Sequence, residues 1–229
     1  MEPIATAQSI RDAEAAWFAA HPGGDLMGLA AAAVAQSSAE LLAGRERLGV
    51  LVVAGPGNNA GDALFAAAGL PELTGVDMPI WVWPVAGTTH HDGLAAALAV
   101  GAVLMDSEDA LQLCSNAGLL IDGVSGLGGR PGLTADVAAV ARAAQATGIP
   151  VLAVDIPSGL VADSGEGHES FVADLTVTFI AKKLAHVAEP AASACGRVEL
   201  VDIGVALPPG TLTNFLKSRN YDEKKSSSI

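Results

Sequence analysis

The stretch from Val50 to Leu70, which reads VLVVAGPGNNAGDALFAAAGL, constrains the fold of this chain more than any other. Its first five residues, Val50–Ala54, form an aliphatic run typical of a strand that is buried on both faces. Turn-forming residues fill positions 55–62, and positions 63–70 are rich in Ala and Leu, which favour a helix. A strand–loop–helix unit of this kind points backbone N–H groups and the positive end of a helix dipole at an anion. The stretch therefore predicts a nucleotide or phosphate site, and a generic glycine-rich turn is the alternative.

Neither of two familiar phosphate-binding loops explains this segment. A P-loop requires a Lys followed by Ser or Thr, and positions 55–62 contain no Lys. A Gly-x-Gly-x-x-Gly dinucleotide fingerprint fails because the third glycine, Gly61, comes one residue late. The paired residues Asn58 and Asn59, together with Asp62, belong to neither motif.

The size and composition of the chain favour one large α/β domain. The chain has 229 residues, of which 51% are hydrophobic and only 4% aromatic, so its core is built from Ala, Val, Leu and Ile. No apolar run is long enough to cross a bilayer without interruption. The N-terminus lacks a basic region before an apolar stretch, and Asp12 and Glu14 argue against a transit peptide. We therefore expect a cytoplasmic protein.

The formal net charge of −13 disfavours binding to nucleic acids and to anionic membranes. The negative charge of an anionic ligand would have to be balanced at its binding site by backbone amides, a few basic side chains or a bound cation. Cys114 and Cys195 do not form a metal-binding pair and are expected to be reduced thiols. The pair His90-His91 precedes an Ala-Leu run and is interpreted as the start of a surface helix, with metal ligation the less favoured alternative.

Strand-like and helical segments alternate along most of the chain. Two helices are expected first, at 6–20 and 26–42, followed by strands at 50–54, 79–83, 118–121, 150–154, 174–180 and 197–202 and helices at 61–69, 92–99, 107–115 and 134–147. This alternation predicts a mostly parallel sheet with helices on both faces. Residues 1–210 are expected to form this domain, and residues 211–229 a polar and disordered C-terminal tail.

Ligands of such sheets bind beyond the carboxyl ends of the strands, which directs attention to three loops at 55–62, 122–132 and 155–165. The second loop begins with Asp122, contains five glycines that allow close approach of a ligand, and includes Arg130, which could pair with a phosphate. In the third loop, Asp155 closes an apolar strand and Ser158 follows on a turn stiffened by Pro157. Glycine-rich surface loops with ordinary capping acids are the alternative interpretation.

The segments GPGNNAGD, LLIDGVSGLGG, PVLAVDIPSGLVADSG, ADLTVTFIAKK and CGRVELVDIGV resemble the NAD(P)H-hydrate epimerase domain family. The resemblance covers most of 48–204 in the right order and spacing, and 9–35 more loosely. It implies a three-layer α/β/α Rossmann-like sandwich with a mostly parallel central sheet and N-terminal helices. It also implies epimerisation of the R and S forms of NADHX and NADPHX, the hydrated forms of NADH and NADPH, with one potassium ion per subunit.

The resemblance also implies roles for particular residues and partners. Asp155 and Asp62 would be catalytic, and Asn59, Asp122 and Ser158 would coordinate potassium. The dinucleotide substrate would be bound by Asn58, Asn59, Ala60, Gly61, Asp62, Gly126, Leu127, Gly128, Gly129, Arg130, Pro131, Gly132 and Asp155. A homodimer would fit the family, and some relatives continue into a dehydratase domain, so the chain is expected to be either a stand-alone epimerase or the front half of a bifunctional protein.

Several positions depart from the family pattern and keep another function open. Ala60 stands where Gly is usual and would be strained if the position required a positive φ. Gly28 replaces a Glu after Met27, Ser125 replaces an aromatic residue, and Leu184-Ala185 replaces Pro-Gly. The alternative is therefore a catalytically silent nucleotide-binding or scaffold protein of the same fold. A nicotinamide dehydrogenase is disfavoured because no hydride-transfer partner is evident.

Overall fold

The computed structural model describes residues 4–47 and 49–211, and its centre is a seven-stranded sheet in the order β3-β2-β1-β4-β5-β6-β7. Every neighbouring pair of strands is parallel. The strands are β1 (Val50–Ala54), β2 (Ile80–Pro84), β3 (Val103–Leu104), β4 (Leu119–Gly123), β5 (Val151–Val154), β6 (Leu175–Phe179) and β7 (Arg197–Val201). The strand order reverses between β1 and β4, which is the switch point where open α/β sheets bind ligands.

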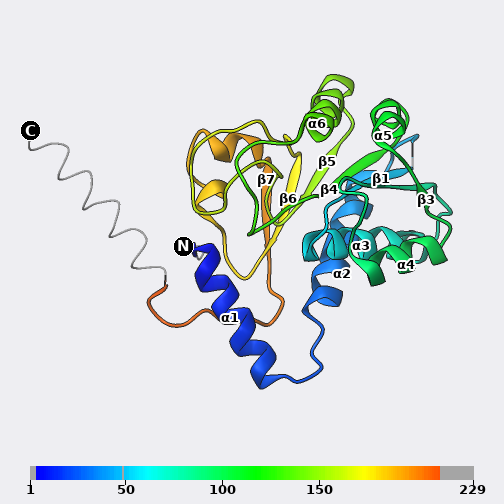
Figure 1. The fold of residues 1–229 in the computed structure, drawn as a ribbon. Helices are drawn as coiled ribbons and strands as arrows, with labels where there is room; N and C mark the ends of the chain where they lie inside the picture. Colours follow the sequence, from blue (N-terminus) through cyan, green and yellow to red (C-terminus); the bar gives the residue numbers. More distant parts are fainter. Residues whose placement is uncertain (1–3, 48, 212–229) are drawn as a thin grey trace, which may run out of the picture.

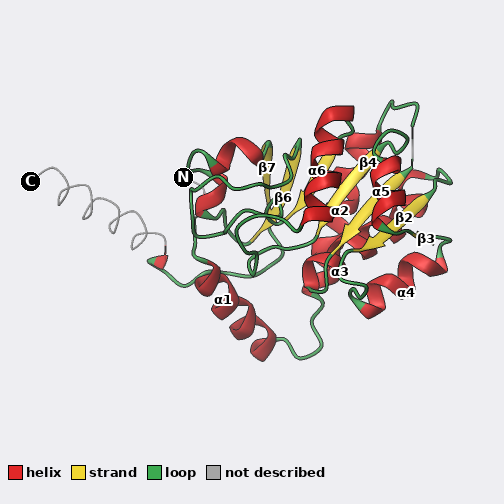
Figure 2. Cartoon of the chain, turned by 45° about the horizontal axis from the view of Figure 1, so that its top comes forward, coloured by secondary structure: helices red, strands yellow, loops and turns green. Residues whose placement is uncertain are grey.

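Helices cover both faces of the sheet and produce three layers (Figures 1 and 2). The α-helices are α1 (Ala7–Ala20), α2 (Leu26–Leu42), α3 (Asn58–Thr74), α4 (His91–Ala99), α5 (Ser107–Leu113) and α6 (Ala135–Thr147), and two 3₁₀ helices, η1 (Leu184–His186) and η2 (Ala191–Ala194), follow β6. Alternate residues of each strand belong to different cores: Val50 and Val52 pack with α2 and α3, whereas Leu51 and Val53 pack with α5 and α6. The predicted three-layer fold is confirmed.

Helix α1 lies beside these layers, near the carboxyl end of the sheet (Figures 1 and 2). Three contacts join the start of the chain to distant segments: Ala5 N–H donates to the carbonyl oxygen of Lys182 at 2.9 Å, Ala7 N–H donates to Asp163 Oδ1 at 2.8 Å, and Arg11 Nη2 donates to the carbonyl oxygen of Leu127 at 2.9 Å. Helix α1 therefore bridges the segments that follow β4, β5 and β6.

The structure differs from the sequence-based expectation at two elements. Helix α3 was expected from residue 61, but it begins at Asn58, so the segment 58–62 forms the first turn of the helix and not a loop. Strand β3 was not expected because it has only two residues, both of them exposed at the edge of the sheet. Apart from Thr211, the predicted tail lies outside the described residues, and no helix among those described is long and apolar enough to span a membrane.

Candidate active site

A cavity of about 810 Å³ opens at the carboxyl ends of β1, β2, β4, β5 and β6. The loops after these five strands line it, together with one side of α1. Ten of the residues singled out from the sequence lie in its wall: Asn58, Asn59, Asp62, Gly126, Leu127, Gly128, Gly129, Arg130, Gly132 and Asp155. Segments separated by about a hundred residues in the sequence therefore meet at the edge of the sheet where parallel α/β folds bind ligands.

Asp155 follows β5 directly and has a left-handed backbone, with a φ of 66°. This conformation costs a residue other than glycine roughly 1–2 kcal/mol, so neighbouring contacts have to maintain it. Its backbone N–H donates to the carbonyl oxygen of Val177 at 2.7 Å, and its own carbonyl oxygen accepts from His186 Nε2 at 2.9 Å. Its carboxylate accepts a hydrogen bond from Thr178 Oγ1 at 3.0 Å and forms an ion pair with Lys183. Backbone and side chain are thus held from several directions, with the carboxylate at the cavity wall.

Lys183 and His186 complete this arrangement, and the sequence analysis assigned neither a role. Lys183 is only 1% exposed, and its Nζ also donates to Thr178 Oγ1 at 2.6 Å. His186 Nδ1 accepts from the backbone N–H of Lys183 at 3.1 Å, so Nε2 carries the proton that is donated to Asp155. Burial, reinforced by the Lys183 charge, lowers the pKa of His186 to about 4 and keeps the ring neutral. The only sequence signal for these two residues was that Lys183 ends the segment ADLTVTFIAKK, which resembles the family.

Two more carboxyl groups line the cavity, and their surroundings raise the pKa of both. Burial, and then the charges of Asp155, Glu14 and Asp25, raise the pKa of Asp62 to about 8. The pKa of Glu14 on α1 is also raised, first by burial and then by Asp155, against the opposing effects of Lys183 and Arg11. At neutral pH the cavity therefore holds a proton donor, Asp62, near a carboxylate that is paired with lysine. Glu14 was missed because no sequence motif surrounds it.

Two helix N-termini point into the cavity without a side-chain cap. Gly57 caps α3 and Thr134 caps α6, and neither makes a side-chain hydrogen bond to its helix, although both residues line the cavity. Each of the other four α-helices begins with a side chain that accepts from its first turn: Thr6, Asp25, His90 and Asp106. Uncapped N-termini offer N–H groups and a positive dipole end, which is the arrangement that binds phosphates.

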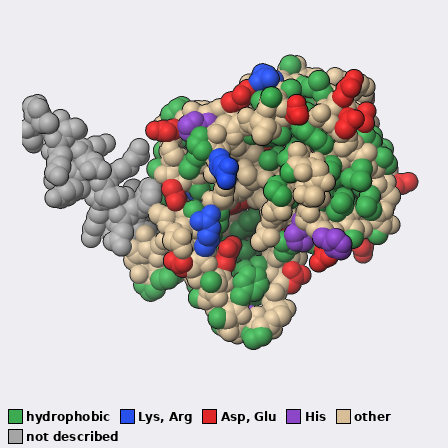
Figure 3. Space-filling view, in the orientation of Figure 1, with side chains coloured by type: hydrophobic (Ala, Val, Ile, Leu, Met, Phe, Trp, Pro, Cys, Tyr) green, Lys and Arg blue, Asp and Glu red, His purple; other side chains and the backbone are tan. Residues whose placement is uncertain are grey.

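The glycine-rich loop 124–134 lies close to the side chains of Asn59 and Asp155. A side chain at Gly126 would approach Asn59 Oδ1 at 2.6 Å and Asp155 Oδ2 at 2.8 Å, so these two oxygens require glycine at this position. Arg11, Arg130 and Lys183 add basic side chains to the cavity wall, although the whole chain carries a net charge of −13. Figure 3 shows Lys and Arg side chains beside a hollow on the face drawn.

Two of the three residues expected to hold potassium, Asp122 and Ser158, are hydrogen-bonded to each other at the carboxyl ends of β4 and β5, whereas the third, Asn59, lines the cavity. Asp122 is 0% exposed and accepts hydrogen bonds from Ser158 Oγ at 2.6 Å and from the Ser158 backbone N–H at 2.7 Å. Burial raises the pKa of Asp122 to about 6 despite these bonds. Asn59 Nδ2 donates to the carbonyl oxygen of Val154 at 2.9 Å, which leaves its Oδ1 as an acceptor.

This set of oxygens fits a monovalent cation. Hard cations take carboxylate, hydroxyl and amide oxygens, and a nearby positive charge would offset the cost of burying the Asp122 carboxylate. Among the described residues, no group of three or more His, Cys, Asp or Glu side chains is placed to hold a metal ion.

Three of the residues expected to bind substrate do not line the cavity, namely Ala60, Gly61 and Pro131. Ala60 is 0% exposed and packs in the core, because the first turn of α3 points successive residues in different directions. Gly61 faces Met27 and His90 on the opposite side of the helix. Since Ala60 is helical, an alanine in place of the usual glycine brings no backbone strain at this position.

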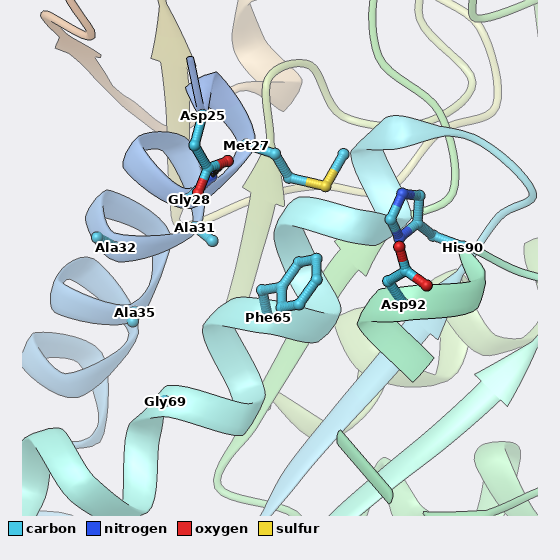
Figure 4. Close-up of a pocket in the computed structure, with 10 residues that line it drawn as sticks. All are labelled: Asp25, Met27, Gly28, Ala31, Ala32, Ala35, Phe65, Gly69, His90 and Asp92. Atoms are coloured by element: carbon cyan, nitrogen blue, oxygen red, sulfur yellow. Dashed lines mark hydrogen bonds between the residues drawn. The ribbon is translucent and has the colours of Figure 1, made fainter. Parts of the chain in front are cut away.

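A second cavity, of about 530 Å³, lies between α2, α3 and the start of α4 (Figure 4). Its floor consists of small or apolar residues such as Ala31, Ala35 and Phe65. Its polar groups are engaged at helix ends, because Asp25 accepts from Gly28 N–H at 2.8 Å and His90 accepts from Gly93 N–H at 3.1 Å. The polar side chains of this second cavity thus serve as helix caps. The larger cavity instead contains a buried ion pair, the proton donor Asp62 and two uncapped helix ends, so it is the candidate active site.

Comparison with known proteins shows which family this chain belongs to. A model of the family described as "YjeF-related protein N-terminus" matches residues 23–185. The chain belongs to this family. It is 38% identical over 219 residues to the NAD(P)H-hydrate epimerase of Clavibacter michiganensis, covering 90% of this chain and 92% of that one. It is also 38% identical over 213 residues to the NAD(P)H-hydrate epimerase of Achromobacter xylosoxidans, covering 91% of this chain and 99% of that one.

A longer relative matches over part of its length. The chain is 34% identical over 234 residues to the "Bifunctional NAD(P)H-hydrate repair enzyme Nnr" of Corynebacterium glutamicum. The match covers 90% of this chain but only 39% of that protein. Members of this family thus occur both at about the length of this chain and as parts of longer proteins.

The raised pKa of Asp62 predicts a pH-dependent stability difference between the wild type and Asp62→Asn. Asp62 binds its proton more tightly in the folded state, with a pKa of about 8 against 3.8, so its contribution to stability is lost as the pH rises towards 8. The neutral Asn avoids this loss. Urea unfolding at about pH 5 and about pH 7.5 should show the variant gaining about 1–3 kcal/mol relative to wild type at the higher pH. A stability difference that does not change with pH would contradict the assignment.

Proposed function

We propose that this protein interconverts the R and S forms of hydrated NADH and NADPH, NADHX and NADPHX, as part of nicotinamide nucleotide repair. Family membership and the names of relatives that match along nearly their whole length support this function. The observation that carries the proposal is the larger cavity, in which two uncapped helix N-termini adjoin an acid and a lysine-paired carboxylate. This combination suits an anionic dinucleotide whose reactive ring needs a proton.

The substrate phosphates are assigned to the N-termini of α3 and α6. Both ends can donate backbone N–H groups to a pyrophosphate, and Arg130 extends from the loop between β4 and α6 to add a positive charge. The glycines of loop 124–134 allow the dinucleotide backbone to approach closely. In this arrangement the hydrated nicotinamide ring is directed towards Asp155 and Asp62.

The chemistry requires loss of a hydroxyl group from C6 and its return on the other face of the ring. Asp62, protonated at neutral pH, donates a proton to the C6 hydroxyl, and the C6–O bond breaks as water leaves with the bonding electron pair. The ring nitrogen lone pair forms a C=N bond and leaves an iminium cation. The Asp155 carboxylate, held by Lys183, faces this positive charge. A water molecule then adds to C6 from the other face and gives its proton to an ionised carboxylate of the cavity, and the C=N electron pair returns to the ring nitrogen.

Asn59, Asp122 and Ser158 are assigned to a potassium ion. When bound, the ion would supply a positive charge beside the dinucleotide and offset the burial of Asp122. The three side chains come from α3, β4 and the turn after β5, so the same strand ends that form the cavity would also hold the cation. We also propose that the protein forms a homodimer. A dehydratase that acts on the S form, either fused to this chain or separate, is a further proposed partner. Both proposals rest on the family resemblance.

The direct test is to incubate the protein with pure S-NADHX and to follow the appearance of R-NADHX by chromatography, against the rate without protein. We expect the protein to accelerate the interconversion. A catalytically silent protein of the same fold would bind NADH or NADPH but leave the epimer ratio unchanged in time, and that result would overturn the proposed function.

Replacement of Asp155 by Asn should abolish epimerisation and leave dinucleotide binding largely intact. Asn tolerates the left-handed backbone and keeps an oxygen that can accept from Lys183, but it cannot stabilise a cation by its charge. We expect the turnover rate to fall by at least about 100-fold, measured with S-NADHX, while calorimetry shows NADPH binding. Asp77→Asn, an exposed loop change, is the matched control. Wild-type turnover in Asp155→Asn would refute the role of Asp155.

Potassium should stabilise the folded protein through Asp122. A cation that binds only the folded state raises the melting temperature as its concentration increases. Melting curves in potassium chloride and in choline chloride at equal ionic strength should differ for the wild type but coincide for Asp122→Asn. Equal melting temperatures of the wild type in the two salts would exclude the site.

A further inference from the structure

Glu14 reaches the candidate active site from a different element than Asp62 does. Glu14 is on α1 and Asp62 is in the first turn of α3, and both line the cavity that Asp155 also lines. The two helices lie apart from each other in both ribbon views (Figures 1 and 2). A ring bound between them would have one carboxyl group on each side and the Asp155–Lys183 pair at the floor.

The position of Glu14 is determined by the contacts of α1. Arg11, one turn before Glu14, donates from Nη2 to the carbonyl oxygen of Leu127 at 2.9 Å. Ile10 is 1% exposed and packs with Ala5 and Ala181. These contacts hold the Glu14 side of α1 against the loops that follow β4 and β6, so its carboxyl group belongs to the cavity wall and not to a mobile surface.

The charges around Glu14 and Asp62 couple the two groups. Burial is the main cause of the raised pKa of both groups; the charges of Asp155 and then of Glu14 add to it at Asp62, and the charge of Asp155 adds to it at Glu14. Lys183 and Arg11 oppose the effect at Glu14, whereas Asp25 reinforces it at Asp62. The negative charge of Glu14 therefore favours the protonated form of Asp62, so Asp62 can act as an acid while Glu14 acts as a base.

Epimerisation creates a need for two such groups. Water leaves from one face of the ring and another water enters from the opposite face, and one fixed side chain cannot transfer protons on both faces. We propose that Glu14 is the acid–base group for the ring face opposite to the one that Asp62 serves, an inference that rests on the proposed epimerase function. In one direction Asp62 protonates the departing hydroxyl group, the C6–O bond breaks, and the ionised Glu14 takes the proton of the incoming water as its oxygen bonds to C6. The C=N electron pair returns to the ring nitrogen, and the reverse reaction exchanges the two roles.

Oxygen exchange tests this division between the two faces. Pure R-NADHX and pure S-NADHX are incubated separately in ¹⁸O-labelled water with wild type, Glu14→Gln, Asp62→Asn and, as a matched control on the same helix, Asp12→Asn. Mass spectrometry after separation of the epimers gives the rate of inversion and the rate of ¹⁸O uptake without inversion. Rates without protein are subtracted, and circular dichroism shows whether each variant is folded.

We expect the wild type and Asp12→Asn to place label in both epimers. Glu14→Gln should lose inversion by at least about 100-fold yet still label one starting epimer with retention of configuration, because Asp62 still serves that face. Asp62→Asn should show the reciprocal pattern with the other epimer. A structural role for Glu14 would lower both processes together for both epimers, and that result, or wild-type inversion in Glu14→Gln, overturns the proposal. Failure of the wild type itself to invert either epimer would instead overturn the proposed function.

Discussion

The buried ion pair between Lys183 and Asp155 is the interaction on which the rest of the site depends. Lys183 is 1% exposed, so removal of either partner would leave a charge buried without compensation, a loss of about 3–5 kcal/mol in comparable pairs. Together with hydrogen bonds to Val177 and from Thr178 and His186, the pair holds Asp155, whose backbone is left-handed. Burial is the main cause of the raised pKa of Glu14 and Asp62, and the charge of Asp155 adds to it at both groups.

The net charge of −13 opposes the binding of an anionic dinucleotide, so the proposed function requires local groups that attract phosphates. The two helices that begin at the cavity, α3 and α6, lack the side-chain caps that the other four α-helices have. Under the proposed function, their backbone N–H groups would bind the phosphates in place of the basic residues that are scarce in this chain. Arg11 and Arg130 add positive charges at the cavity wall, although the chain as a whole is acidic.

The sequence predicted the sheet and most of the cavity because both follow from local patterns. Buried strands are aliphatic runs, and in a parallel sheet the residues that follow those runs, such as Asn59 and Asp155, meet at one edge. Other features depend on packing between distant segments. Glu14 reaches the site only because α1 packs against the loops after β4 and β6, and no pattern around it signals that contact. The ion pair of Lys183 depends on a turn after β6, and the left-handed backbone of Asp155 is unusual for a residue other than glycine. The start of α3 was misplaced because Asn58 and Asn59 are typical of turns as well as of first helical turns.

A crystal structure of the protein grown with NADPH and potassium tests the central claim most directly, because the claim is about where one ring lies. The account predicts the nicotinamide ring between Glu14 and Asp62, with C6 facing the Asp155 carboxylate and the pyrophosphate at the N-termini of α3 and α6. A dinucleotide bound in the cavity between α2 and α3, or bound in the larger cavity with its adenine end against Asp155, would contradict it.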